Sequence, residues 1–238
     1  MDALATGLLG AAILLLVLLL PRLLGASQNK KGWSMLIMGP AGAGKTSLFV
    51  RLRDGKLRNT VTSMQPNECK VEVSDRKRVH VIDLPGHPRL EESYFQKEVV
   101  NAKGVVVVVD SINFNASKDE FARQMYRLLT SPVIRGRGVP ILVACNKSDG
   151  GAKAHTIEFI RKRTEKLVYE LYQADVGDSM RDASAREHDI LGGNADEFKF
   201  ADLALKRRFH RPIEVTFERI SVKVGDIDAV RRFVAACK

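Results

Sequence analysis

A glycine-rich segment near the start of the chain has the residue types and spacing of a phosphate-binding loop. Gly39, Gly44, Lys45 and Thr46 match GxxxxGK[ST] in GPAGAGKT, which lies between an apolar run and a helical pattern. In such a loop backbone N–H groups surround the phosphates, the lysine adds positive charge, and the threonine hydroxyl ligates Mg²⁺. The predicted phosphate-binding residues are Gly39, Ala41, Gly42, Ala43, Gly44, Lys45, Thr46 and Ser47.

A second motif indicates which base this pocket selects. Asn146, Lys147 and Asp149 stand in ACNKSD, directly after the apolar run ILVA. An aspartate carboxylate accepts from both N1–H and the exocyclic amine of guanine, a pattern that adenine does not present. Asn146 can hold the loop together, and the Lys147 stem can lie along the base plane. Taken alone NKxD is also typical of a turn after a strand, but about 100 residues after a phosphate loop it favours guanine.

A third motif, DLPGH, follows another apolar run. Asp83 is placed to hold Mg²⁺ through water, and the Gly86 N–H can contact a γ-phosphate because no side chain intervenes. For His87 two interpretations stay open: a solvent-facing loop histidine, or a catalytic residue that orders the attacking water. The three motifs together predict GTP and Mg²⁺ as cofactors.

The N-terminus predicts a membrane span. Residues 3–20 (ALATGLLGAAILLLVLLL) carry no charge and, as a helix, reach about 27 Å, close to the thickness of a hydrocarbon core. A cleaved signal peptide or a buried helix is the alternative, but the residues before the run include Asp2 and no positively charged side chain, and Arg22, Lys30 and Lys31 follow the run. Positive flanks stay on the cytosolic side, so we expect an uncut anchor with everything after it in the cytosol.

This interpretation divides the chain into three parts. We expect a transmembrane signal-anchor helix at 1–24, a short basic tether at 25–32 (GASQNKKG), and one cytosolic domain at 33–238. Residues 175–197 are rich in Asp, Ser, Ala and Gly and have little periodicity, which is typical of a polar surface insertion.

Composition narrows the classes of partner. The formal charge of +10 could serve a nucleic acid, an anionic membrane surface or an acidic protein. Aromatic residues make up only 6%, and the Lys and Arg are spread along the chain without a stacking platform, so we expect no sequence-specific nucleic-acid contact. Cys69, Cys145 and Cys237 lie far apart and match no metal or disulfide pattern, which fits a reducing compartment.

Apolar runs alternate with amphipathic patterns along the rest of the chain. Unbroken β-branched runs, such as the five valines at 105–109, suit strands covered on both faces. We expect strands at 33–38, 71–73, 79–82, 105–109, 140–144 and 213–220, and helices at 47–52, 119–130, 156–173 and 227–236. This alternation predicts an α/β fold: a mostly parallel sheet with helices on both faces.

The motifs carry a family resemblance. GPAGAGKT, a segment with Thr62 (NTVTSMQPN), DLPGH and NKSD, in this order after a lone N-terminal span, resemble the small GTPases. Together with that span they are most similar to the β subunits of the eukaryotic signal recognition particle receptor. The similarity covers nearly the whole chain, including EFKFADLALKRRFHRPIEVTFE before and within the last strand.

The resemblance implies a Ras-like P-loop GTPase domain and further site residues. Thr62 stands where the family's first switch supplies a threonine to Mg²⁺ and γ-phosphate, although a plain loop threonine is the alternative. Ser221, Val222 and Lys223 stand in place of the family's Ser-Ala-Lys guanine loop, with Val a departure from Ala. At the position of His87 the Ras group has Gln, whereas translation factors and the β subunits of the receptor have His, so hydrolysis of GTP stays open. The implied metal ligands are Thr46, Thr62 and Asp83.

Two functions follow as hypotheses. In the first, the chain is a GTP-binding, membrane-anchored subunit that docks the N-terminal domain of the receptor's α subunit at the endoplasmic reticulum for cotranslational targeting, with the ribosome or translocon as further partners. In the second it is an autonomous Arf- or Sar-like switch in vesicle trafficking. The span argues against the second, because a transmembrane helix does not leave the membrane as a single acyl chain does.

Overall fold

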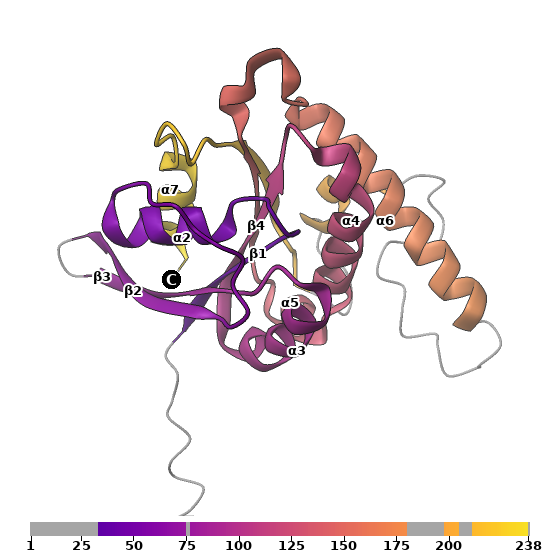
Figure 1. Cartoon of the computed structure of the whole chain (residues 1–238). Helices are drawn as coiled ribbons and strands as arrows, with labels where there is room; N and C mark the ends of the chain where they lie inside the picture. The colour runs from indigo at the N-terminus through magenta and orange to yellow at the C-terminus, as the bar shows by residue number, and fades with distance from the viewer. Residues whose placement is uncertain (1–32, 75–76, 180–197, 205–210, 238) are drawn as a thin grey trace, which may run out of the picture. The chain divides into compact units, whose positions relative to one another are not determined.

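The computed structural model describes residues 33–74, 77–179, 198–204 and 211–237 (Figure 1). Six strands form one sheet in the order β2-β3-β1-β4-β5-β6. The strands are β1 (Ser34–Met38), β2 (Asn67–Ser74), β3 (Lys77–Asp83), β4 (Ala102–Asp110), β5 (Ile141–Asn146) and β6 (Val215–Arg219). Every neighbouring pair is parallel except β2 and β3, which pair antiparallel. The predicted mostly parallel sheet is therefore confirmed.

Helices cover both faces of this sheet, as expected. The helices are α2 (Lys45–Asp54), α3 (Pro88–Glu98), α4 (Phe114–Thr130), α5 (Pro132–Arg137), α6 (Ile157–Ser179) and α7 (Asp228–Ala236), with short 3-10 turns η1 (Val99–Asn101), η2 (Ser148–Lys153) and η4 (Phe200–Ala204). Figure 1 shows α2 and α7 on one side, and α3 to α6 on the other. Apolar residues of the two sets belong to two separate core clusters.

Strand β4 shows why a run of valines marks the centre of such a sheet. All five residues of 105–109 are fully buried. Side chains alternate between the faces of a strand, so Val105, Val107 and Val109 pack in the cluster under α3 to α6. Val106 and Val108 pack in the cluster under α2 and α7. A strand with apolar side chains on both faces is stable only between two layers of helices.

Some elements differ from the sequence-based expectation. The sequence did not predict α3, because two of its three buried residues are glutamates, Glu91 and Glu98, which weaken the apolar periodicity. Helix α4 begins at Phe114 rather than 119, since the Phe114 ring is buried and packs edge-on against Phe121. Helix α6 continues to Ser179, past the expected end at 173, and the Tyr126 hydroxyl of α4 donates to Asp175 on this extension (2.6 Å).

The described residues do not test the predicted membrane span. No helix among them is both long enough and apolar enough to cross a bilayer. The expected span at 1–24 and the expected tether at 25–32 lie outside the described residues. The same is true of 180–197, the larger part of the expected insertion, whereas 175–179 belong to α6.

The parallel strands bring the sequence motifs to one edge. Gly39, Asp83, Asp110 and Asn146 stand at or directly after the carboxyl ends of β1, β3, β4 and β5. Ligands of open α/β sheets bind at this edge. Trp33 precedes β1 and therefore stands at the opposite edge.

Candidate nucleotide-binding site

The phosphate loop, residues 39–46, links β1 to α2 in a conformation that glycine permits. Gly39 and Gly44 have φ of 138° and 97°, values that residues with a Cβ rarely adopt. A Cβ on Gly39 would collide with the Val108 carbonyl of β4, and one on Gly44 with the Asn146 amide. The glycine spacing of the motif therefore lets the loop run close to both β4 and β5.

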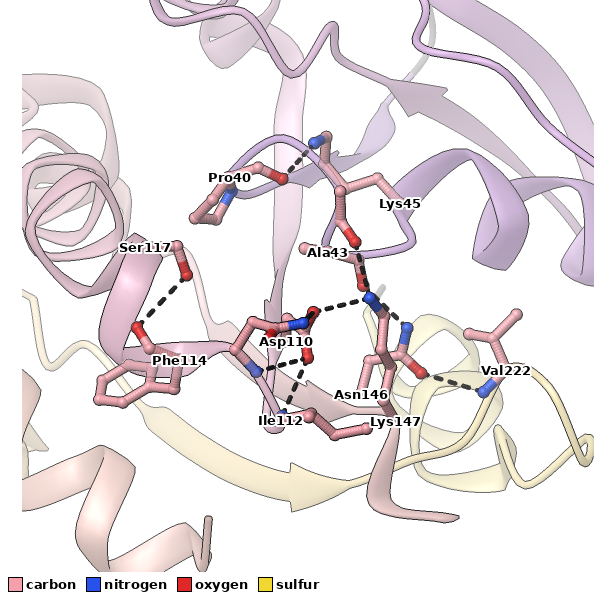
Figure 2. Close-up of polar contacts among 12 residues, drawn as sticks. Pro40, Ala43, Lys45, Asp110, Ile112, Phe114, Ser117, Asn146, Lys147 and Val222 are labelled. Carbon is pink, nitrogen blue, oxygen red and sulfur yellow. Dashed lines mark hydrogen bonds and ion pairs between the residues drawn. The ribbon is translucent and has the colours of Figure 1, made fainter. Parts of the chain in front are cut away.

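Lys45 lies buried at the start of α2 (Figure 2). Its Nζ donates to the Pro40 carbonyl at 2.8 Å, so the ammonium curls back over the loop. Burial lowers the pKa of Lys45, and the nearby Asp83 carboxylate opposes that shift. A Cβ on Gly86 would lie 2.9 Å from this Nζ and 3.1 Å from the Ala41 Cα. Gly86 of the DLPGH segment can therefore lie this close to the lysine only because it has no side chain.

A cavity of about 220 Å³ opens over this loop. It is lined by Ala41, Gly42, Gly44, Lys45, Thr46, Ser47, Thr60, Val61, Thr62, Ser63 and Gly86. Of the predicted phosphate-binding residues, Gly39 and Ala43 do not line it; Ala43 is buried beneath the loop. A glycine-rich backbone, an ammonium and several hydroxyls along one cavity together match a polyphosphate.

The predicted metal ligands Thr46 and Asp83 meet beside this cavity. The Thr46 hydroxyl donates to Asp83 Oδ2 at 2.8 Å, and the Asn67 amide donates to the same oxygen at 3.0 Å. Asp83 is fully buried, and burial raises the pKa of its carboxyl despite these hydrogen bonds. Its other oxygen, Oδ1, has no hydrogen-bond partner among the described residues.

These groups fit Mg²⁺. A buried carboxylate with an unpaired oxygen next to a hydroxyl provides the oxygen donors that this cation prefers, leaving room for phosphate oxygens and water. Among the described residues, no group of three or more His, Cys, Asp and Glu side chains is arranged to hold a metal ion. Thr62 lines the same cavity but is exposed, and it is the next residue, Ser63, whose hydroxyl lies 3.3 Å from that of Thr46.

Asn146 connects the phosphate loop with the loop after β6. Its Nδ2 donates to the Ala43 carbonyl at 2.8 Å, and its Oδ1 accepts from the Val222 N–H at 3.0 Å (Figure 2). Both bonds are buried. One amide therefore holds two segments that are far apart in sequence in a single arrangement.

Lys147 is held on the same edge. It is the one residue other than glycine with positive φ (64°) among those the structure describes. Its Nζ forms a 2.6 Å ion pair with Asp110 and donates to the Gly42 carbonyl at 3.0 Å. Although burial would raise the pKa of Asp110, hydrogen bonds from Lys147, Asn113 and Ile112 lower it overall. The lysine stem thus runs along the edge where a base would lie.

The predicted guanine residues come together at the end of β6. The Ser221 hydroxyl donates to Asp149 Oδ1 at 2.5 Å. Ser221 is buried and Asp149 is exposed, so the serine orients a carboxylate that faces solvent. The Val222 side chain is buried in the core under α2 and α7, which accommodates the valine. Lys223 is exposed.

Sequence reasoning missed four residues that shape this site. Arg51 of α2 donates to the carbonyls of Val222 (2.7 Å) and Lys223 (3.2 Å) and so supports the loop at 221–223. The other three are Ser63, Asn67 and Asp110. The sequence could have indicated Asp110, because this residue directly follows the run of valines and therefore ends its strand at the same edge as Asn146. Ser63 lies in a loop, Asn67 begins β2 and Arg51 lies within α2, and no motif in the sequence marked any of them.

His87 is placed differently from the other predicted residues. It is the exposed residue preceding α3, its carbonyl accepts from the Glu91 N–H at 2.9 Å, and it does not line the cavity. The position fits either interpretation of this side chain, and a catalytic role stays a prediction.

Comparisons with known proteins identify relatives of this chain. The family model described as "Signal recognition particle receptor beta subunit" matches residues 30–206. The chain is 32% identical over 206 residues to the signal recognition particle receptor subunit beta of Rattus norvegicus, covering 85% of this chain and 73% of the relative.

Solved structures agree as well. The mammalian SRP receptor matches with a TM-score of 0.71 and 29% identity over 86% of this chain and all of the matched chain. The SRb-GTP/SRX complex of Chaetomium thermophilum matches with a TM-score of 0.64 and 20% identity, covering 86% of this chain and 98% of that one, which shows the fold. From its sequence, fold and site, the chain belongs to the family of signal recognition particle receptor β subunits.

Proposed function

We propose that this chain is the GTP-binding β subunit of a signal recognition particle receptor, and that its GTP-bound form docks the α subunit at the endoplasmic reticulum membrane. The observation that carries the proposal is the pairing of Ser221 with Asp149 on the same sheet edge as the phosphate cavity. A polyphosphate pocket and an oriented carboxylate at one edge fit a guanine nucleotide better than a phosphate alone.

In the proposed complex the phosphates lie on the loop at 39–47 and against Gly86. Lys45 supplies positive charge, and its buried position makes that charge effective because the local dielectric is low. Asp149 accepts from the guanine N1–H and amine, while Asn146, Lys147 and the backbone at 221–223 hold the base edge. Asn146 supports this arrangement by its bonds to Ala43 and Val222.

Mg²⁺ would be held by Thr46 and Thr62, with Asp83 acting on it through water. The cation would neutralise phosphate charge and orient the terminal phosphate. Thr46 and Asp83 are already in contact, which supports their part. Thr62 is exposed beside the cavity, so its part requires the segment around it to close over the phosphate.

A surface beside the cavity supports docking of a protein partner. Val61 and Met64 are 87% and 66% exposed, and Leu57 on the same segment is 47% exposed. Exposed apolar side chains next to a phosphate cavity give a surface whose shape depends on the bound nucleotide. We propose that this segment, 57–64, contacts the N-terminal domain of the α subunit when GTP orders it.

The membrane part of the proposal comes from the sequence. Residues 1–24 are proposed to span the bilayer once, 25–32 to form the tether, and 33–238 to lie on the cytosolic side. The Arf- or Sar-like alternative is not favoured, because the family match is to the receptor subunit and a permanent span does not suit a cycle between membrane and cytosol. The docking role needs bound GTP and leaves hydrolysis, and with it His87, as a separate question.

One experiment tests the guanine assignment. Asp149→Asn replaces an acceptor by an amide that also donates, which matches the 2-oxo group of xanthine better than the amine of guanine. The variant should lose affinity for GTP and gain affinity for xanthosine triphosphate, measured by competition with a fluorescent nucleotide. An unchanged preference for GTP would show that Asp149 does not read the base.

A second experiment tests docking. Full-length protein in liposomes is loaded with GTP or GDP and incubated with purified α subunit, and the bound α subunit is measured after flotation. We expect capture with GTP and weak capture with GDP. Met64→Asp, at a residue of the segment that does not line the phosphate cavity, should reduce capture without changing GTP affinity, whereas Val224→Asp, at a residue of similar exposure outside 57–64, should not reduce it. Equal capture with both nucleotides would contradict the proposal.

A further inference from the structure

The sheet edge opposite the nucleotide site carries an exposed tryptophan between two cations. Trp33 is 54% exposed, and the Lys103 Nζ and Arg137 Cζ lie 4.5 Å and 4.3 Å from its ring centroid. Arg137 also donates to the Val100 carbonyl at 2.7 Å, and the Val100 side chain is 57% exposed. We call Trp33, Val100, Lys103 and Arg137 the Trp33 face.

This face borders a cavity of about 570 Å³ with an excess of positive charge. Among the residues that line it, the charged ones are Lys103, Arg137, Arg211 and Glu214, three cations against one carboxylate. Within the described part of the chain, neither Lys103 nor Arg137 forms an ion pair with a carboxylate. Among the described residues, no carboxylate therefore neutralises these two charges by direct contact.

The Trp33 face lies where the proposed membrane anchor enters the domain. Lys103 is the second residue of strand β4, and Trp33 directly precedes β1, so both stand at the amino ends of parallel strands. Residues 25–32, the proposed tether, separate the proposed span from Trp33, and fully extended they reach about 28 Å at most. The bilayer surface is thus within reach of this face.

We propose that the Trp33 face rests on the anionic surface of the membrane, with Trp33 at the level of the lipid headgroups and Lys103 and Arg137 against their phosphates. This inference rests on the membrane span proposed above. Tryptophan is enriched at membrane–water interfaces because its ring is amphipathic. Cations near an anionic leaflet gain favourable electrostatic energy, and arginine pairs well with phosphate.

The orientation has a consequence for function. The cavity over the phosphate loop stands at the carboxyl ends of the strands, on the opposite edge of the sheet. If the Trp33 face contacts the bilayer, the nucleotide and residues 57–64 face the cytosol. An incoming α subunit then meets an unobstructed surface, which a freely rotating domain on a flexible tether would offer only part of the time.

Trp33 is the only tryptophan in the chain, so its fluorescence reports on this face directly. Full-length protein is reconstituted into liposomes containing acyl-brominated quencher lipid, either in neutral phosphatidylcholine alone or with phosphatidylserine added. Quenching of Trp33 should be at least about twofold greater with the anionic lipid. The double change Lys103→Glu and Arg137→Glu should reduce quenching to the level in neutral lipid. The matched control, Lys162→Glu with Lys166→Glu at exposed positions of α6, should leave it unchanged.

The tether alone would bring Trp33 near a bilayer of either composition and cause some quenching. The inference is therefore tested by the difference in quenching between anionic and neutral lipid, and by the loss of that difference in the double variant. Equal quenching in both compositions, or quenching unaffected by the double change, overturns the inference. GTP affinity in the same liposomes should be unchanged by the double substitution, which shows that the variant is folded. If it does not fold, Lys103→Gln with Arg137→Gln takes its place, with the same expected loss.

Alkaline carbonate extraction separates this inference from the proposed anchor. If the protein resists extraction but its quenching does not depend on lipid composition, the span is retained and the proposed contact of the Trp33 face with the membrane is contradicted. Protein that is extracted contradicts the span, and the inference falls with it. GTP-dependent capture of the α subunit, measured as above, tests the docking role independently of both.

Discussion

The Ser221 hydroxyl donates a 2.5 Å hydrogen bond to the Asp149 carboxylate, joining the end of β6 to the loop after β5. Ser221 also stands within hydrogen-bond distance of the Val224 N–H (3.4 Å), so the serine supports its own loop as well. An acceptor held in place before the ligand arrives binds more tightly, because less freedom is lost on binding. Ser221 thus acts by positioning Asp149.

Ser221→Ala should weaken guanine nucleotide binding. The change frees the Asp149 carboxylate, and a hydrogen bond to a charged group contributes on the order of 1 to 2 kcal/mol, so we expect the Kd for GTP to rise about 5- to 30-fold. Titration with fluorescent GTP measures this. Ser148→Ala, a change in the same motif at a half-buried serine, serves as the control and should leave the Kd unchanged. Equal affinities for native protein and Ser221→Ala would refute the positioning role.

Asn146→Ala should destabilise the fold as well as the site. The change leaves the Ala43 carbonyl and the Val222 N–H buried without their partner, and each such group costs about 1 to 2 kcal/mol. We therefore expect the free energy of unfolding in urea to fall by about 2 to 4 kcal/mol. Asn115→Ala, at an exposed asparagine in contact with His155, should change it by less than about 0.5 kcal/mol. Similar losses for the two variants would contradict the bridging role.

Asp83→Asn should separate stability from metal binding. Burial raises the pKa of Asp83, so between its unfolded and folded pKa values the folded chain holds a proton that the unfolded chain lacks, and the free energy of unfolding falls as pH rises. The neutral amide removes this cost, and without Mg²⁺ and nucleotide the variant should be at least as stable as the native protein at pH 7.

The same variant should bind metal poorly. We expect the Mg²⁺ concentration that half-maximally supports GTP binding to rise about 10- to 100-fold, because the carboxylate no longer orients water around the cation. Thermal unfolding with and without Mg²⁺ and GTP measures both effects. A variant that is destabilised without ligand, yet keeps normal Mg²⁺ dependence, would contradict the assignment of Asp83.

Arg127→Ala should destabilise the contact between α3 and α4. Arg127 pairs with the buried Glu91 at 2.6 Å, and Gln124 donates to the same carboxylate at 3.1 Å. Removal of the guanidinium leaves a buried charge unpaired, which costs about 3 to 5 kcal/mol in the free energy of unfolding. Glu92→Gln is the matched control, because exposed Glu92 lies 3.9 Å from the same arginine, and its change should cost no more than about 1 kcal/mol.

The pH dependence gives a second measurement of this pair. Burial raises the pKa of Glu91, and the charge of Arg127 opposes the rise. Without Arg127 the folded pKa rises further, so the variant should lose more stability than the native protein as pH increases from about 4 towards neutral. Parallel pH profiles of the two proteins would show that the ion pair does not control the charge on Glu91.

The sequence alone determined the α/β fold and the positions of the phosphate and base motifs. These are local patterns: a valine run needs cover on both faces, and a motif after a strand stands at the carboxyl edge wherever strands are parallel. For this reason the sequence predicted that Thr46, Asp83, Asn146 and Asp149 belong to one site, without predicting which side chains they contact. Helix α3 did not follow, because its buried glutamates hide the apolar period.

Which side chains contact one another in the site depends on the tertiary structure. Ser63, rather than Thr62, approaches Thr46, and Arg51 of α2 supports a loop that lies 171 residues later in the sequence. Trp33 contacts Lys103 because β1 and β4 are neighbours in the sheet, and it contacts Arg137 because the end of helix α5 lies near the start of β1. Such contacts depend on strand order and register, which arise from the packing of the whole domain and leave no pattern along the chain.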